Sequence, residues 1–323
     1  MEDMSLEKCP KLYYRKNTTG LTLTACYGIS GNLYLPDEIG GVPITEIAPY
    51  TFSENEISEE DLVYLSEEAQ FLQSMKRVKT TDVQEVRLPF EIREIGRYAF
   101  YRCRNLRKLI LSDGILEIGG GALSGCRGIR EVEIYFKRGE KSALKSILDE
   151  VRFEIHTMLY YKDGIAEIVF PEHYEEAVED TPARQFVTEH HGSGGDYRQC
   201  FYQRELDFKK YDALLYRARA EETVSTISRM ALGRLKYPYK LSDTAKAAYE
   251  KYLAENLQEV VCILVEKEDI EGLQFLAKAR LWTEEALQNG IEKASEFRKT
   301  EILSFLMDEK HMCFPKKKKS FDL

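Results

Sequence analysis

The chain has 323 residues, 43% of them hydrophobic, and a formal net charge of −9 at pH 7. This length and apolar content allow substantial cores, and two domains are the natural expectation. The negative charge argues against general binding of nucleic acid or of anionic membrane surfaces. Because no apolar run approaches the roughly 18 residues of a membrane-spanning helix, we expect no membrane insertion.

Residues 1–17 contain no apolar core segment and therefore do not form a secretory signal peptide. The seven cysteines are odd in number and lack clustered spacing, which favours reduced thiols over a disulfide framework. These two observations predict a cytoplasmic protein. Secretion would require a leader that this sequence does not contain.

Two alternating segments, 11–16 and 21–28, flank a turn of the sequence Asn-Thr-Thr-Gly and predict a β-hairpin. A short strand that ends in proline follows at 32–36. We interpret residues 1–52 as an N-terminal hairpin cap joined to a divergent first repeat, since the end of a stacked array must meet water.

Residues 53–82 begin with an acidic stretch and then place Leu62, Leu65, Ala69 and Leu72 at helical spacing. The acidic run 58–61 resembles a helix start. We predict a helical insertion on the convex side of the array. An acidic docking surface is the alternative to a plain solvated helix.

Residues 86–134 match themselves when they are shifted by 23 residues. A fixed apolar period of this kind marks a solenoid, in which each coil needs neighbours to bury its apolar side. Val86, Leu88, Leu109 and Leu111 alternate along short strands and are expected to point inward. Equivalent pairs under the shift include Leu88 and Leu111, Ile95 and Ile118, Gly96 and Gly119, Ala99 and Ala122, and Cys103 and Cys126.

The pattern Leu-Pro-x-x-Ile-x-x-Ile-Gly-x-x-Ala-Phe-x-x-Cys-x-x-Leu at residues 88–106 resembles the BspA-type (treponemal-type) leucine-rich repeat. The resemblance covers about residues 12–136, and the third repeat departs from it at Ser112 and Leu123. It implies a curved α/β solenoid with short parallel strands, repeats of about 23 residues and a protein-binding role. We assign the repeats to residues 83–136.

Residues 137–210 form a divergent transition segment, in which we expect a helix at 141–151 and strands at 153–156 and 166–170. The second strand, followed by Pro171, could be another coil of the solenoid. The glycine-rich segment 190–195 predicts a flexible loop and, by composition, an internal boundary.

A helical period replaces the repeat from about residue 211. Leu276 and Leu306 belong to two similar segments thirty residues apart, which weakly resemble ankyrin-like helical hairpins. We predict an all-α helical-hairpin domain over residues 211–313. A basic tail at 314–323 is expected to be disordered, with a nuclear-targeting or anionic-surface role as the alternative.

No segment carries a catalytic, metal or cofactor motif that we would assign. His190, His191, Asp196 and Cys200 lie close in sequence, but nothing in their spacing orients a nucleophile or matches a zinc site. Cys103 and Cys126 could approach one another in stacked coils, although packing as small apolar side chains explains them better. Residues 119–121 lack the context of a phosphate-binding loop.

The predicted function is non-enzymatic protein binding through the outward face of the repeat strands, with an unidentified protein as partner. A cell-surface adhesion protein of the same repeat family is the first alternative, and an enzyme with its site in residues 153–210 is the second. Tyrosine and arginine are favoured interface anchors, and Ile110 is expected to be exposed unless something covers it. The candidate partner-binding residues are Tyr34, Arg87, Lys108, Ile110, Glu131 and Glu133.

Overall fold

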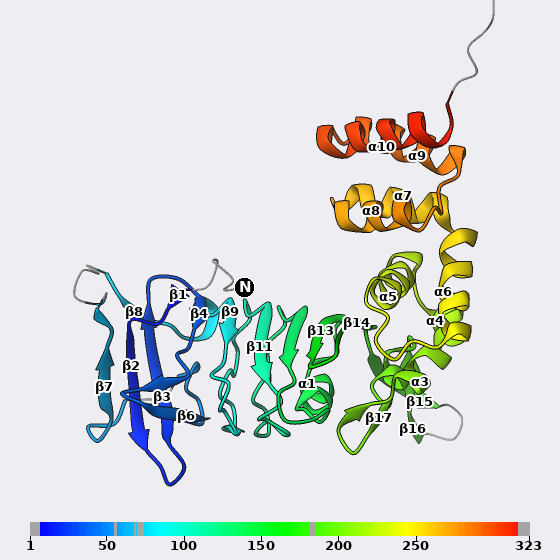
Figure 1. Cartoon of the computed structure of the whole chain (residues 1–323). Helices are drawn as coiled ribbons and strands as arrows, with labels where there is room; N and C mark the ends of the chain where they lie inside the picture. Colours follow the sequence, from blue (N-terminus) through cyan, green and yellow to red (C-terminus); the bar gives the residue numbers. More distant parts are fainter. Residues whose placement is uncertain (1–6, 55–56, 68, 70–73, 181–184, 316–323) are drawn as a thin grey trace, which may run out of the picture. The chain divides into compact units, whose positions relative to one another are not determined.

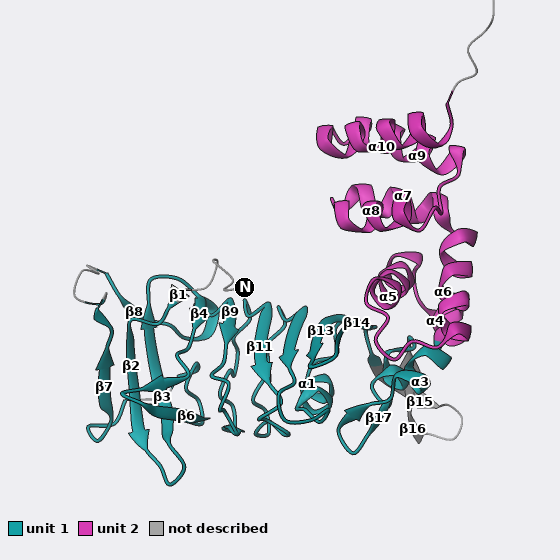
Figure 2. Cartoon of the chain, in the orientation of Figure 1, with its two compact units in different colours: residues 1–214 teal, residues 215–323 magenta. Residues whose placement is uncertain are grey.

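The computed structural model describes residues 7–54, 57–67, 69, 74–180 and 185–315. It contains two compact units, Met1–Leu214 and Leu215–Leu323, which Figures 1 and 2 show as a strand-rich part and a helical part. The described residues of the first unit form two large sheets, both of which include strands of the repeats, and two two-stranded sheets, β15-β16 and β17-β18. The second unit contains helices only among its described residues.

The sheet of the repeats has the strand order β1-β4-β9-β11-β12-β13-β14. All pairings from β1 to β13 are parallel, as expected for successive coils of a solenoid. Leu33, Val86, Leu109 and Val132 are aligned with one another across the strands and are completely buried. The strands are β1 Glu7–Lys8, β4 Asn32–Tyr34, β9 Glu85–Arg87, β11 Lys108–Ser112, β12 Glu131–Tyr135, β13 Ile155–Tyr161 and β14 Gly164–Phe170.

The second sheet has the order β10-β6-β3-β2-β7 and includes the N-terminal hairpin. The predicted hairpin is confirmed, because β2 and β3 occupy the two expected segments and pair in an antiparallel manner. Its strands are β2 Lys11–Lys16, β3 Leu21–Gly28, β6 Val42–Ile47, β7 Leu62–Leu65 and β10 Glu94–Ile95, with β5 Glu38–Ile39 paired to β6 and β8 Lys76–Arg77 paired to β3.

The return segments of the coils are successions of tight turns rather than helices. Tyr98 and Arg102 have positive φ angles of 57° and 60°, which a right-handed helix does not allow. The rings of Phe52 and Phe100 stack between neighbouring coils with centroids 4.7 Å apart. The apolar spacing in these segments therefore reflects repeated turns whose side chains all face one core.

The prediction of a helical insertion at 53–82 is wrong at the residues expected to form its first turns, although the segment ends in the short 3₁₀ helix η2 Thr80–Asp82. Leu62–Leu65 is strand β7, which pairs with the free edge of β2. At the expected helix start, the Asp61 carboxylate instead accepts a hydrogen bond from the Ser58 N–H at 3.0 Å and closes a turn. A helix here would have left β2 unpaired on one side. Leu72 lies outside the described residues.

The segment after the repeats closes the array. The predicted helix is α1 Leu144–Glu150, whereas β14 is antiparallel to β13 and so forms a hairpin rather than another coil. The loop predicted at 190–195 is also wrong, because His190 and His191 end strand β16 and Gly194 begins α2. The elements are β15 Tyr174–Asp180, β16 Gln185–His191, α2 Gly194–Tyr197, β17 Phe201–Tyr202, β18 Glu205–Leu206 and α3 Phe208–Ala213.

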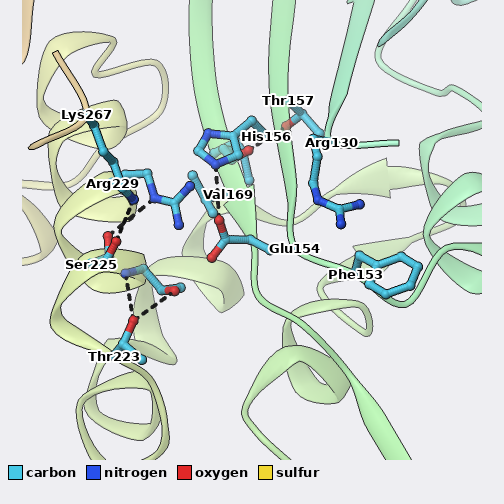
Figure 3. Close-up of polar contacts among 12 residues, drawn as sticks. Arg130, Phe153, Glu154, His156, Thr157, Val169, Thr223, Ser225, Arg229 and Lys267 are labelled. Carbon is cyan, nitrogen blue, oxygen red and sulfur yellow. Dashed lines mark hydrogen bonds and ion pairs between the residues drawn. The ribbon is translucent and has the colours of Figure 1, made fainter. Parts of the chain in front are cut away.

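The helical unit consists of successive short helices, several of which have a side-chain cap. The hydroxyl of Ser242 accepts a hydrogen bond from the Ala245 N–H, and Thr283 caps α9 in the same way. Within this unit Lys267 Nζ donates to Ser225 Oγ at 2.6 Å (Figure 3). The helices are α4 Leu215–Glu221, α5 Val224–Lys236, α6 Asp243–Glu255, α7 Leu257–Glu266, α8 Ile270–Lys278, α9 Glu284–Glu296 and α10 Thr300–Cys313.

Candidate functional site

The six candidate residues lie on one side of the repeat sheet, which we call the strand face. Their strands alternate, so that the side chains between them enter the core. The strand register places them in two rows that cross neighbouring strands. The first row is Tyr34, Arg87, Ile110, Glu133 and Met158, and the second row is Asn32, Glu85, Lys108, Glu131 and His156.

Arg87 is the fixed centre of the first row. Its guanidinium lies over the rings of Tyr34 and Phe90, with its carbon 4.2 and 4.4 Å from their centroids. It also donates to both carboxylate oxygens of Asp37 at 3.2 Å and to the carbonyl of Leu35 at 3.1 Å. Only 7% of Arg87 is exposed, so it organises the face rather than projecting from it.

Ile110 is covered and not exposed, because only 6% of its surface reaches solvent. Its neighbours in the row are Arg87 and Glu133. Glu133 forms an ion pair with Lys108 at 2.8 Å, and both side chains are largely shielded. We infer that the aliphatic parts of these long side chains cover Ile110 while their charged ends remain near the surface.

An aromatic cluster formed by Phe90, Tyr135 and Tyr160 borders the first row. Tyr135 stacks on Tyr160 with centroids 4.5 Å apart, and Phe90 meets Tyr135 edge-on at 5.8 Å. Burial and the nearby Glu133 carboxylate raise the pKa of the Tyr135 hydroxyl above its ordinary value. Lys137 Nζ lies 3.6 Å from the centroid of the Phe90 ring.

Sequence reasoning missed this cluster, although one signal was present. Tyr135 follows Glu133 by two residues and so has the outward phase of β12. Tyr160 could not be placed beside it, because the predicted strand at 153–156 ended before that residue. In the structure β13 runs on to Tyr161, and Tyr135 and Tyr160 are register partners.

Acidic side chains gather near the far end of the second row. Glu131 is exposed, and its register partner His156 lies with Nε2 3.2 Å from a carboxylate oxygen of Glu154. Figure 3 shows the side chains of His156 and Glu154 facing one another, with Arg130 beside the ring of Phe153. Along the array, Arg87 and Lys108 are neutralised by Asp37 and Glu133, and the exposed Glu131 follows them.

A comparison with protein-family models identifies the repeats. A model of the BspA type leucine-rich repeat region matches residues 45–177 in six copies. Residues 45–177 are therefore similar to the BspA-type leucine-rich repeat region. The match begins after the hairpin strands β2 and β3, within the divergent first repeat. It extends past residue 136, at which the repeats assigned from the sequence end. Neither the search of curated proteins nor the search of solved structures found a match.

The match therefore assigns the strand face to the BspA-type region, since most of the strands that form it lie within residues 45–177. This repeat family supports protein interaction or adhesion in general terms. Among the described residues, no helix is long and apolar enough to cross a membrane. The resemblance of the helical unit to ankyrin-like hairpins receives no support from the comparisons.

The cysteine considered as a nucleophile lies away from the strand face. Cys200 is completely buried, and its Sγ donates to the carbonyl of Asp196 at 3.5 Å. Burial raises the pKa of this thiol to about 12. The side chains of His190 and His191 lie outside the described residues. In the part of the chain that the structure describes, no three His, Cys, Asp or Glu side chains are grouped as metal ligands.

Two other motifs have structural roles in the BspA-type region. Cys103 Sγ donates to the carbonyl of Phe52, and Cys126 Sγ donates to the carbonyl of Phe100, so the two cysteines repeat one contact. The N–H groups of Gly121 and Leu123 donate to the Glu150 carboxylate at 2.8 and 2.7 Å. The N–H groups of Gly121 and Leu123 are therefore already hydrogen-bonded to a side chain of the protein itself.

Proposed function

We propose that this protein is a non-enzymatic interaction module that binds a protein partner through its strand face. The arrangement of Arg87 between Tyr34 and Phe90, next to the stacked Tyr135 and Tyr160, is the observation that carries the proposal. Interfaces are enriched in arginine and aromatic side chains. Side chains that are already held in place lose little conformational entropy on binding.

The charges of the face add a preference for one kind of partner. Arg87 and Lys108 are already paired with Asp37 and Glu133, whereas Glu131 is exposed. A partner with a basic or hydrogen-bond-donating group opposite Glu131 would complement this end of the face. The aromatic cluster would supply the apolar contact beside it.

The experiment uses exposed residues, because substitutions at Arg87 or Ile110 would disturb the fold. Wild type is compared with the double variant Glu131→Arg and Lys137→Glu in crosslinking capture from native lysate. A matched control carries Glu94→Arg and Arg104→Glu, which are also exposed and also exchange one charge of each sign. We expect the face variant to capture the partner about tenfold less than both other proteins, since rim charges affect association.

The crosslinks themselves locate the partner. If the proposal is right, lysine crosslinks to the partner form at Lys137, which is exposed beside the aromatic cluster. Equal capture by all three proteins, with crosslinks elsewhere, would contradict binding through the strand face. Circular dichroism checks that the three proteins have the same fold.

We also propose a cytoplasmic location. The thiols of Cys103 and Cys126, each donating to a backbone carbonyl, suit a reducing compartment. The adhesion alternative requires the same face to work outside the cell. Fractionation of cells that express the protein distinguishes the two, since an adhesion protein would be found at the surface.

A further inference from the structure

The edge of the second sheet exposes an apolar strand. Strand β7 is the last strand in the order β10-β6-β3-β2-β7, and Figure 1 shows it beyond β2. Leu62, Val63 and Leu65 are 44%, 48% and 56% exposed. Successive residues of a strand point to opposite faces, so β7 presents apolar side chains to solvent on both sides.

The backbone of β7 also has an open side. The N–H of Ser66 donates to the carbonyl of Pro10, and Tyr64 is aligned with Leu12. In an antiparallel ladder alternate residues bond to the partner strand. The N–H and C=O groups of Val63 and Leu65 therefore point away from β2, and no strand among the described residues pairs with them.

Edge strands of this kind normally carry a charge, a proline or a cover that prevents pairing with other chains. Within β7 there is none, since its sequence is Leu-Val-Tyr-Leu. The charges lie at its two ends instead, where Glu59, Glu60 and Glu67 are exposed. Asp61 does not add to them, because its carboxylate is bonded to Arg15, Thr24 and the Ser58 N–H.

A pocket of about 720 Å³ lies beside the end of β7. It brings Tyr64 and Tyr34 together with the carboxylates of Glu38 and Glu67 and one ammonium group, so it favours a basic side chain that can also lie against an aromatic ring. The third carboxylate, that of Asp37, is already bonded to Arg87. Six of its lining residues are Lys8, Tyr34, Asp37, Glu38, Tyr64 and Glu67.

We propose that β7 accepts an added strand from a partner protein: an extended segment, apolar in its middle and basic at its ends. The backbone groups of Val63 and Leu65 would bond to the segment, as in other cases of strand addition. Leu62, Val63 and Leu65 would contact its apolar side chains, and the flanking glutamates and the pocket would hold its basic ends. Strand β7 lies outside the strand face, and the pocket beside it shares only Tyr34 with the rows of that face. Strand addition at β7 does not depend on the proposed function.

A second copy of the chain fits this edge less well. In an antiparallel pair of two β7 strands, Glu59 and Glu60 of one copy would lie opposite Glu67 of the other. Like charges placed opposite one another destabilise strand pairing. The acidic ends thus select against self-association and for a basic segment.

The test uses a synthetic fluorescent peptide of alternating valine and threonine with a pair of lysines at each end. Its control has glutamates in place of the lysines. Fluorescence anisotropy at low ionic strength should show the lysine peptide binding wild type at least about tenfold more tightly than the glutamate peptide. Hydrogen exchange should slow at residues 62–65 when the lysine peptide is added.

Two variants separate the parts of the proposal. Val63→Pro removes only an N–H that points to the open edge, where proline is tolerated, and should weaken binding about tenfold or more while the fold persists. Glu60→Lys with Glu67→Lys should reverse the preference between the two peptides. The matched control Glu94→Lys with Glu172→Lys changes the net charge equally, at exposed residues outside β7, and should leave the preference unchanged.

Three results would overturn the proposal. The first is that neither peptide binds wild type, and the second is that the lysine peptide binds Val63→Pro as tightly as wild type. The third is that wild type forms dimers in sedimentation velocity and Val63→Pro does not, because a second copy would then be the occupant. Binding through the strand face can fail independently, since its variants do not touch β7.

Discussion

At the scale of single residues, the reactivity of a side chain depends on its environment in the fold more than on the residues next to it in the sequence. Cys200 follows two histidines and an aspartate, the residue types of a cysteine nucleophile or a metal site. In the structure it is completely buried and bonded to a backbone carbonyl, and burial raises the pKa of its thiol from 9.0 to about 12. A neutral thiol is a poor nucleophile and a poor metal ligand.

This predicts that Cys200 resists alkylation in the native protein. At pH 8 a thiol with a pKa near 12 is ionised in only about one molecule in ten thousand, and ionisation rises with pH. Native protein treated with iodoacetamide should be labelled at the exposed Cys313 and not at Cys200, as read by peptide mass spectrometry. Labelling of Cys200 at the rate of Cys313 would revive the nucleophile interpretation.

At the scale of elements, the corner of each coil depends on the absence of a side chain. Gly96 and Gly119 occupy equivalent corners of neighbouring coils. A Cβ at Gly119 would lie 2.5 Å from the backbone nitrogen of Arg97, and one at Gly96 would collide with the backbone nitrogen of Pro49. Because these neighbours are backbone atoms, a substituent can be accommodated only by moving the coils apart.

We therefore predict that Gly119→Ala lowers the free energy of unfolding by about 1–3 kcal/mol, as overpacking does elsewhere. The adjacent Gly120→Ala is the matched control, since nothing lies within 4 Å of a Cβ there and its φ is not positive. That change should alter stability by less than about 1 kcal/mol. Urea unfolding followed by circular dichroism measures both, and equal midpoints would refute the packing argument.

At the scale of the whole molecule, the boundary between the units lies at Leu214 and not in the glycine-rich segment at 190–195. The composition of residues 190–195 indicates flexibility, but residues that follow them fix the end of the first unit by hydrogen bonds. Arg198 is 3% exposed and donates to the carbonyls of Leu148, Pro171, Gly194, Val151 and Phe153. Tyr211 also donates, through its hydroxyl, to the carbonyl of Val169.

Two truncations test this boundary. A fragment of residues 1–214 should fold and unfold cooperatively, because it keeps Arg198 and Tyr211. A fragment of residues 1–195 should be destabilised by at least about 3 kcal/mol or fail to fold, since it leaves several buried carbonyls unpaired. Thermal unfolding monitored by circular dichroism compares the two, and equal stability would show that these bonds contribute little.

The sequence alone was sufficient for features that depend on short-range periodicity. The 23-residue spacing aligned Leu88 with Leu111 and predicted which side chains of the strands point inward and which point outward, because parallel coils repeat one backbone path. The hairpin followed from local alternation and its turn residues, and the helical domain followed from the helical period after about residue 211.

Only the tertiary structure decided features that depend on partners far away in the chain. Arg87 pairs with Asp37 and β7 pairs with β2, each about fifty residues distant, so no local pattern could reveal either contact. The same holds for Ile110, which is buried although its strand phase points outward. Periodicity determines the side on which a residue lies, whereas its exposure depends on the long side chains and edge strands that other parts of the chain bring to that side.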